Sequence, residues 1–208
     1  MGKIFDYDNK FFQALEGIAN IVILNFLFII CCIPIVTIGA SMTATYSVAI
    51  SIVDDREPYI FREFFKKFKE NFKQSTIVWI ILFLVGVFIS VDFYICSLLS
   101  NNMICTVLKF VLTLVSIVLG FVIIYVFPLI SKFENSVKNT LVNAILISVQ
   151  NLPYTIVMLI ISLLPIGSLL LFPNYWGQII FFNTAISYGM VAYLNSIFLN
   201  KILNKYIN

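Results

Sequence analysis

The sequence predicts an all-α integral membrane protein with about six transmembrane helices in three hairpins, accompanied by cytoplasmic amphipathic helices. Of its 208 residues, 61% are hydrophobic and only 11% are charged, whereas about a quarter of the residues in an ordinary soluble domain are charged. A soluble globule of this size cannot cover so much apolar surface. The composition therefore excludes a soluble enzyme and a disordered tail, and the net charge of +3 is too small to indicate a nucleic-acid partner.

Six apolar stretches have about the length that a helix needs to cross a bilayer. They are residues 17–35, 37–54, 76–99, 104–128, 153–172 and 178–199. Pro34 and Gly39 separate the first two, because proline removes a backbone donor and glycine tolerates a tight turn. Short turns near residues 100–102 and 173–177 join the other pairs. Together these spans form a single membrane domain over residues 1–208.

The basic residues predict the orientation of these spans. On the six-span scheme, twelve of the 13 Lys and Arg residues lie on one side, and the three tight turns on the other side contain none. Basic residues accumulate in cytoplasmic loops. Both termini are therefore predicted to be cytoplasmic, and the thirteenth basic residue, Lys109, falls inside a span.

An amphipathic helix is predicted over residues 59–74, here called the Phe/Lys segment. Its five phenylalanines fall within an arc of roughly 100°; they are Phe61, Phe64, Phe65, Phe68 and Phe72. Such a face is typical of a helix at the membrane surface, and it also suits docking into a groove of a partner protein. The local net charge of +3 does not by itself require recognition of anionic lipids. A second, nearly uncharged segment over 137–149 is predicted at the same boundary.

Asp92 and Lys109 are the ionisable residues that lie deepest in the predicted spans. They flank the turn at residues 100–102 almost symmetrically, which places them at one depth, and a lone charge there costs about 2.5–3.5 kcal/mol. We therefore expect an ion pair that fixes the register of the hairpin. A role in ion or proton coupling and independent positions of the two side chains are the alternatives. Cys96 and Cys105 are also nearly symmetric, and we expect two free thiols, with a disulfide as the alternative.

Groups that commonly perform catalysis are scarce in this chain. It has no histidine, and its four cysteines lack the CxxC spacing of zinc sites. Paired carboxylates and a glycine-rich phosphate loop are also missing from the sequence. We therefore expect a protein that is not an enzyme, with no catalytic residues, no cofactor and no metal.

Three segments resemble the YesL-like family of bacterial membrane proteins, a family of unknown function. They are Ile33-Pro34-Ile35-Val36-Thr37-Ile38-Gly39-Ala40-Ser41, Phe64-Phe65-Lys66 and Asn71-Phe72-Lys73-Gln74-Ser75-Thr76. The resemblance implies a multi-pass protein of the bacterial cytoplasmic membrane. Similar proteins tend to be encoded beside ATP-driven carbohydrate importers (ABC importers) and sensor-kinase systems. No catalytic residue can be transferred from this family.

Two functions remain open on these grounds. The first is a non-enzymatic accessory or regulatory subunit of a carbohydrate ABC importer or sensing system, with the lipid bilayer and an importer permease or sensor kinase as partners. The second is a small transporter or channel that acts alone, suggested by Asp92, Lys109 and several asparagines near or within spans.

Overall fold

The computed structural model describes residues 10–54, 56, 59–98 and 103–206, with side chains from residue 15 onward. Within this part of the chain every regular element is helical. The α-helices are α1 (Lys10–Cys32), α2 (Ile38–Val53), α3 (Ile60–Leu98), α4 (Met103–Lys132), α5 (Val137–Gln150), α6 (Leu152–Leu171), α7 (Trp176–Phe182) and α8 (Tyr188–Leu203). Short 3₁₀ turns lie at Ile35–Thr37, Pro173–Tyr175 and Asn204–Tyr206, and a π-helix (η3) at Asn183–Ser187.

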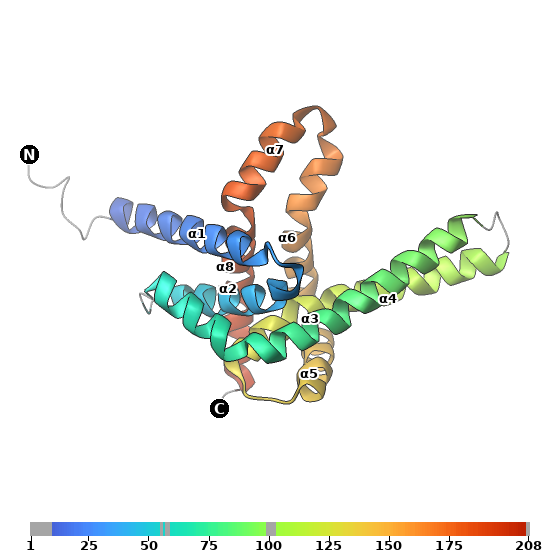
Figure 1. The fold of residues 1–208 in the computed structure, drawn as a ribbon, viewed down its shortest axis with the longest axis horizontal. Helices are drawn as coiled ribbons and strands as arrows, with labels where there is room; N and C mark the ends of the chain where they lie inside the picture. Colours follow the sequence, from blue (N-terminus) through green and yellow to red (C-terminus); the bar gives the residue numbers. More distant parts are fainter. Residues whose placement is uncertain (1–9, 55, 57–58, 99–102, 207–208) are drawn as a thin grey trace, which may run out of the picture.

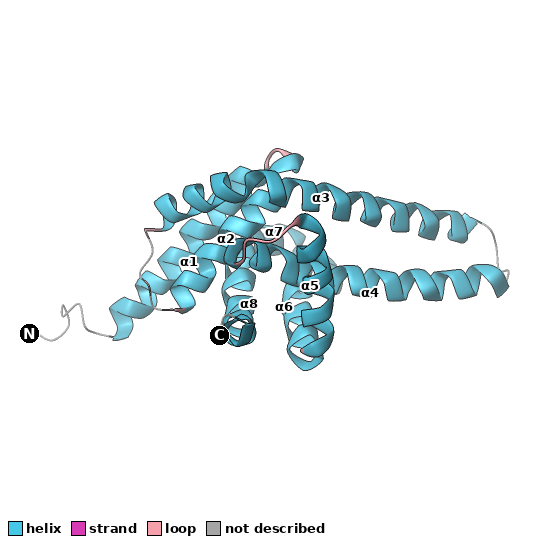
Figure 2. Cartoon of the chain, turned by 90° about the horizontal axis from the view of Figure 1, so that it is seen from below, coloured by secondary structure: helices cyan, strands magenta, loops and turns pink. Residues whose placement is uncertain are grey.

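Five segments are long and apolar enough to cross a membrane. They are Leu15–Cys32, Ile35–Val53, Ile60–Leu98, Met103–Lys132 and Leu152–Leu171. The all-α class is confirmed, and the chain is a multi-span membrane protein. Figures 1 and 2 show α3 and α4 projecting together as one arm, while α6 and α7 form a second arm in Figure 1. Large apolar side chains such as Phe88, Phe110 and Leu170 are exposed along these arms, as expected for helices that contact lipid.

The sixth predicted span, 178–199, is not one α-helix. Helix α7 leads into the π-helix at Asn183–Ser187, and α8 follows without a turn. A π-turn inserts one extra residue into a helix and is favoured where other groups satisfy the displaced backbone. The contact that does so here involves Asn25 and is described below.

The predicted amphipathic helix 59–74 and the predicted span 76–99 are one continuous helix, α3. The sequence around Gln74, Ser75 and Thr76 contains neither glycine nor proline, so nothing interrupts the backbone hydrogen bonds there. Figure 1 shows α3 changing direction between the part beside α2 and the part that pairs with α4. The second predicted amphipathic segment, 137–149, corresponds to α5.

Helix α2 is enclosed by protein. Its residues are buried almost without interruption from Gly39 to Ser51, against α1, α3, α4 and α8. Many of them are small, which allows neighbouring backbones to approach closely. Helix α2 lies along the Phe/Lys segment, so the turn before Gly39 sits beside Ser75 of α3. Ser75 is about 35 Å along the helix from Leu98 at 1.5 Å per residue. The turn between α1 and α2 therefore contacts α3 far along the helix from its end at Leu98, and the common level of the three tight turns stays a prediction.

The best-packed part of the molecule lies where α2, α3, α4, α6 and α8 meet. Its largest fully buried side chains include Phe64, Tyr125, Phe127, Met158 and Leu199. The Tyr125 hydroxyl is 2.8 Å from Thr155 Oγ1, which joins α4 to α6 inside this core. This core thus holds together α4 and α6, one helix from each arm, and it also packs against Phe64 of the Phe/Lys segment.

Candidate functional site

Two of the three segments that carry the family resemblance touch each other in the fold. A Cβ added to Gly39 would lie 2.6 Å from Cβ of Trp79 and would also meet the backbone oxygen of Ser75. One turn further along α2, the hydroxyls of Thr43 and Ser75 form a buried hydrogen bond of 2.7 Å. Glycine at position 39 is therefore required by the close approach of α2 to α3. Pro34 precedes the 3₁₀ turn, and Thr37 donates to the backbone oxygens of Cys31 (2.5 Å) and Pro34 (2.7 Å).

The five phenylalanines of the Phe/Lys segment do not share one environment. Phe64 is fully buried against the core, and Phe68 packs on it at a ring distance of 6.2 Å. Phe61, Phe65 and Phe72 remain exposed at 60%, 41% and 39%. The predicted single apolar face is thus wrong in this respect, because one edge of the arc packs into the protein and the rest points outward.

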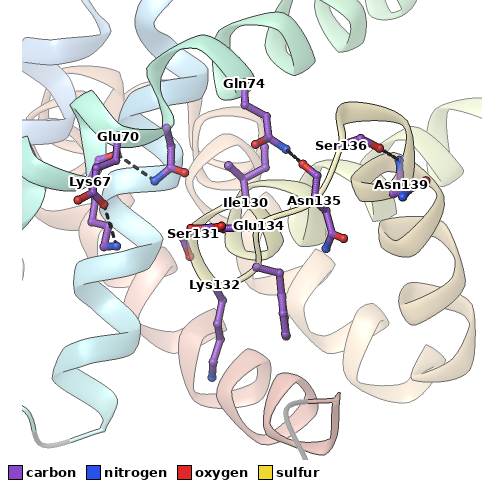
Figure 3. Close-up of a pocket in the computed structure, with 12 residues that line it drawn as sticks. Lys67, Glu70, Gln74, Ile130, Ser131, Lys132, Glu134, Asn135, Ser136 and Asn139 are labelled. Atoms are coloured by element: carbon purple, nitrogen blue, oxygen red, sulfur yellow. Dashed lines mark hydrogen bonds and ion pairs between the residues drawn. The ribbon is translucent and has the colours of Figure 1, made fainter.

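A polar cleft of about 910 Å³ lies between the Phe/Lys segment, the end of α4 and the start of α5 (Figure 3). It is lined by Lys67, Glu70, Asn71, Gln74, Ile130, Ser131, Lys132, Phe133, Glu134, Asn135, Ser136 and Asn139. The Gln74 side-chain amide nitrogen Nε2 donates to the backbone oxygen of Asn135 at 2.9 Å and to Thr140 Oγ1 at 3.2 Å. This amide ties α3 to the loop before α5 and so sets the width of the cleft.

The charges in the cleft are balanced. Lys67 Nζ lies 2.9 Å from Glu70 Oε2, and Lys132 Nζ donates to Asn204 Oδ1 at 2.7 Å, away from Glu134. The Ser136 side chain caps α5 by accepting from the backbone nitrogen of Asn139 at 3.3 Å. Such a lining suits a polar segment of a partner that exchanges hydrogen bonds with amides. Across the described residues, no group of three or more Cys, Asp or Glu side chains is arranged to hold a metal ion.

Asn25 of α1 accounts for the π-helix. Its amide nitrogen donates to the backbone oxygen of Thr184 at 2.6 Å, and its amide oxygen accepts from the backbone nitrogen of Gly189 at 3.0 Å. These two backbone groups are five residues apart, the spacing that a π-turn would otherwise join directly. Asn25 is fully buried. A Cβ on Gly189 would lie 2.6 Å from the backbone oxygen of Ile21, so this helix crossing also requires glycine.

A second buried polar group joins α2, α6 and α8. Asn195 Nδ2 lies 2.9 Å from Ser162 Oγ and 3.5 Å from the Tyr46 hydroxyl. The Asn195 amide oxygen is buried and has no hydrogen-bond partner among the described residues. The hydroxyls of Thr45 on α2 and Ser196 on α8 share this property. Unpartnered polar atoms in a membrane protein interior are costly unless water or a ligand satisfies them.

Asp92 and Lys109 lie on facing helices of the α3–α4 arm. Both are near Cys96, whose side chain neighbours that of Cys105, and both cysteines are free thiols. The salt bridges among the described residues join Arg56 to Asp54 and Lys66 or Lys67 to Glu70, and none joins Asp92 to Lys109 within 4.0 Å. The Asp92–Lys109 ion pair stays a prediction.

Comparison with known protein families finds a match for the N-terminal part of the chain. Residues 21–93 match the family described as "Protein of unknown function, DUF624". The matched segment runs from Ile21 in α1 through α2 to Phe93 in α3, so it contains the contact between Gly39 and Ser75. Only one wall of the cleft, from Lys67 to Gln74, lies within it. No curated protein and no solved structure matches the chain.

Sequence reasoning missed the cleft and the Asn25 contact. The wall formed by residues 130–139 meets α3 only through the fold, because Gln74 and Asn135 are 61 positions apart. A serine at position 136 is a typical N-cap, so it could have predicted where α5 begins in that wall. For Asn25, the signal was an asparagine inside an apolar stretch, which predicts an interhelical hydrogen bond without naming its partner.

Proposed function

We propose that the chain is a non-enzymatic accessory or regulatory subunit of a bacterial carbohydrate ABC importer or sensing system. The resemblance to the YesL-like family supports this assignment, because similar proteins tend to be encoded beside such importers and sensor kinases. The DUF624 match is consistent with it at the level of the family and assigns no activity. An importer permease or a sensor kinase is the expected partner.

The polar cleft is the observation that supports a docking role best. Its volume of about 910 Å³ is large enough for several residues of a partner, and its walls come from three separate elements. Asn71 donates from its side chain to the backbone oxygen of Lys67, and Gln74 donates to the backbone oxygen of Asn135, so both side-chain amides are held in place. A preformed polar groove of this kind binds a partner segment without having to order its own side chains first.

The proposal places the protein in the bacterial cytoplasmic membrane with both termini and the cleft on the cytoplasmic side. The basic side chains support this orientation, since Lys67 and Lys132 line the cleft and Lys138 and Lys201 lie on neighbouring elements. Basic residues near span ends favour the cytoplasm. The cleft would then face the part of the cell where nucleotide-binding subunits and kinase domains operate.

Copurification of the tagged full chain in mild detergent tests this function. Asn139→Trp places a large side chain in the cleft, and Lys138→Trp places the same side chain on the adjacent exposed position outside its lining. We expect an importer permease or sensor kinase to copurify with the wild type and with Lys138→Trp but not with Asn139→Trp. Equal recovery with both variants, or no such subunit with the wild type, would contradict the proposal.

A stand-alone transporter is the second candidate, favoured by the buried polar group around Asn195. The unpartnered amide oxygen of Asn195 belongs to a side chain that joins α2, α6 and α8, as a polar path between helices would require. Flux measured in liposomes containing the purified chain alone would support this candidate if Asn195→Leu abolished it. Flux unchanged by both Asn195→Leu and Asp92→Asn would remove its support.

A further inference from the structure

The outward side of the Phe/Lys segment has two adjacent stripes of different chemistry. Phe61, Phe65 and Phe72 fall within about 40° around the helix at 3.6 residues per turn, and all three are exposed. The neighbouring arc, about 60° wide on the same geometry, contains four exposed basic residues. They are Arg62, Lys66, Lys69 and Lys73.

The acidic residues of this segment lie beyond the basic stripe, on the side away from the phenylalanines. Glu63 accepts a hydrogen bond from Ser51 of α2 at 2.6 Å. Glu70 pairs with Lys67 at 2.9 Å and reaches Lys66 only at 4.0 Å. The two carboxylates therefore bind Ser51 and Lys67, on the side of the protein interior and the cleft. The positive charge of the basic stripe, beside the phenylalanine stripe, is largely uncompensated.

The aromatic stripe continues onto the membrane-spanning part of the same helix. Phe83 falls at the rotational position of Phe65, eighteen residues or five turns further along α3, and it is 46% exposed. The apolar window within α3 has a mean hydropathy of 2.5. The side of the segment that shows phenylalanine is thus the side on which the span contacts lipid.

We propose that the Phe/Lys segment binds anionic phospholipid headgroups through Arg62, Lys66, Lys69 and Lys73. The exposed phenylalanine rings enter the boundary between headgroups and acyl chains, as in other amphipathic surface helices. The long basic side chains then extend from this depth to the lipid phosphates. The guanidinium of Arg62 matches two phosphate oxygens at once.

Charge complementarity and continuity with the span favour lipid over a cytosolic protein as the occupant. A protein groove would have to cover the phenylalanines on the side where the membrane-spanning part of the same helix exposes Phe83. Anionic headgroups are present at that level in any membrane with a negative surface, and each basic residue near it adds about fivefold in affinity. The surface is separate from the polar cleft, so this proposal does not depend on the proposed function.

Native mass spectrometry of the full chain in detergent tests the proposal, with phosphatidylglycerol and phosphatidylcholine of identical acyl chains as the probes. We expect the wild type to retain phosphatidylglycerol preferentially. The triple variant Lys66→Gln, Lys69→Gln, Lys73→Gln should lose about a hundredfold in affinity for that lipid. The matched control, Lys138→Gln, Lys201→Gln, Lys205→Gln, removes the same charge from exposed positions and should lose less than fivefold.

Three results would overturn the proposal. The first is equal binding of the two lipids by the wild type, which needs no variant and is independent of folding. The second is an equal loss in the test and control variants. The third is unchanged phosphatidylglycerol binding by the test variant together with loss of a copurifying protein, which would make the segment a protein-docking surface.

Discussion

Replacing Asn25 by leucine should destabilise the fold by removing the amide that supports the π-helix. Leucine has the same number and branching of side-chain heavy atoms, so the change removes both hydrogen bonds without leaving a cavity. The backbone oxygen of Thr184 and the backbone nitrogen of Gly189 would then lose the partner that they have at 2.6 and 3.0 Å. Neither can bond to the other directly while a side chain occupies the space between them.

The expected loss follows from the energies of these two bonds. A buried backbone group without a partner costs about 1–3 kcal/mol in soluble proteins, whereas interhelical hydrogen bonds in membranes average about 0.6 kcal/mol and reach about 1.7 kcal/mol. Two bonds at the membrane values give a decrease of about 1–3 kcal/mol in the free energy of unfolding. The position lies at the crossing of α1 with α8, so the loss should affect the whole core and not one helix end.

Equilibrium unfolding in mixed micelles with increasing dodecyl sulfate measures this change, and the intrinsic fluorescence of Trp79 and Trp176 reports it. Asn20→Leu is the matched control, because Asn20 lies on the same helix at a partly exposed position and should change the free energy by less than about 0.5 kcal/mol. If Asn25→Leu and Asn20→Leu were equally stable, the account of the π-helix would be refuted.

Three further predictions use simpler readouts. Gly39→Ala should lower the free energy of unfolding by about 1–3 kcal/mol, since its Cβ would lie 2.6 Å from Cβ of Trp79. Gly167→Ala is the control and should leave the free energy of unfolding unchanged, because a Cβ there has nothing within 4 Å. Equal effects of the two substitutions would contradict the close contact at Gly39. Lys109→Met should lower the stability of the α3–α4 arm, and adding Asp92→Asn should restore it. Equal destabilisation by the single and the double variant would argue against the ion pair. In a cysteine-free chain, Asn174→Cys should react with an impermeant maleimide from outside intact cells, and reaction only after permeabilisation would reverse the predicted orientation.

The class of the protein and most helix positions follow from the sequence, because they depend on local composition. Apolar length alone predicts the parts of α3, α4 and α6 that can cross a membrane. The continuity of α3 through Ser75 was also encoded locally, since no helix-breaking residue lies there. The prediction of two separate helices for the charged and the apolar part was wrong about where the helix ends, but both parts are helical as predicted.

The features that sequence reasoning did not find depend on distant partners. The burial of Phe64 follows from α2 lying along the Phe/Lys segment, and no periodicity in the segment itself distinguishes Phe64 from Phe61. Asn25 and Thr184 are 159 positions apart, so the interruption of the sixth span could not be read from residues 178–199. Small residues in α2 were a usable signal that this helix is enclosed by protein, because close helix contacts require them.

Site-specific photo-crosslinking from the cleft tests the central claim, the docking of a partner subunit, most directly. A benzophenone amino acid at position 139 lies in the cleft lining, and the same group at position 138 lies outside it. In cells that contain the native importer and kinase systems, we predict an adduct with an importer permease or sensor kinase from position 139 and none from position 138. Adducts with lipid alone from position 139, or the same protein adduct from both positions, would contradict the proposed function.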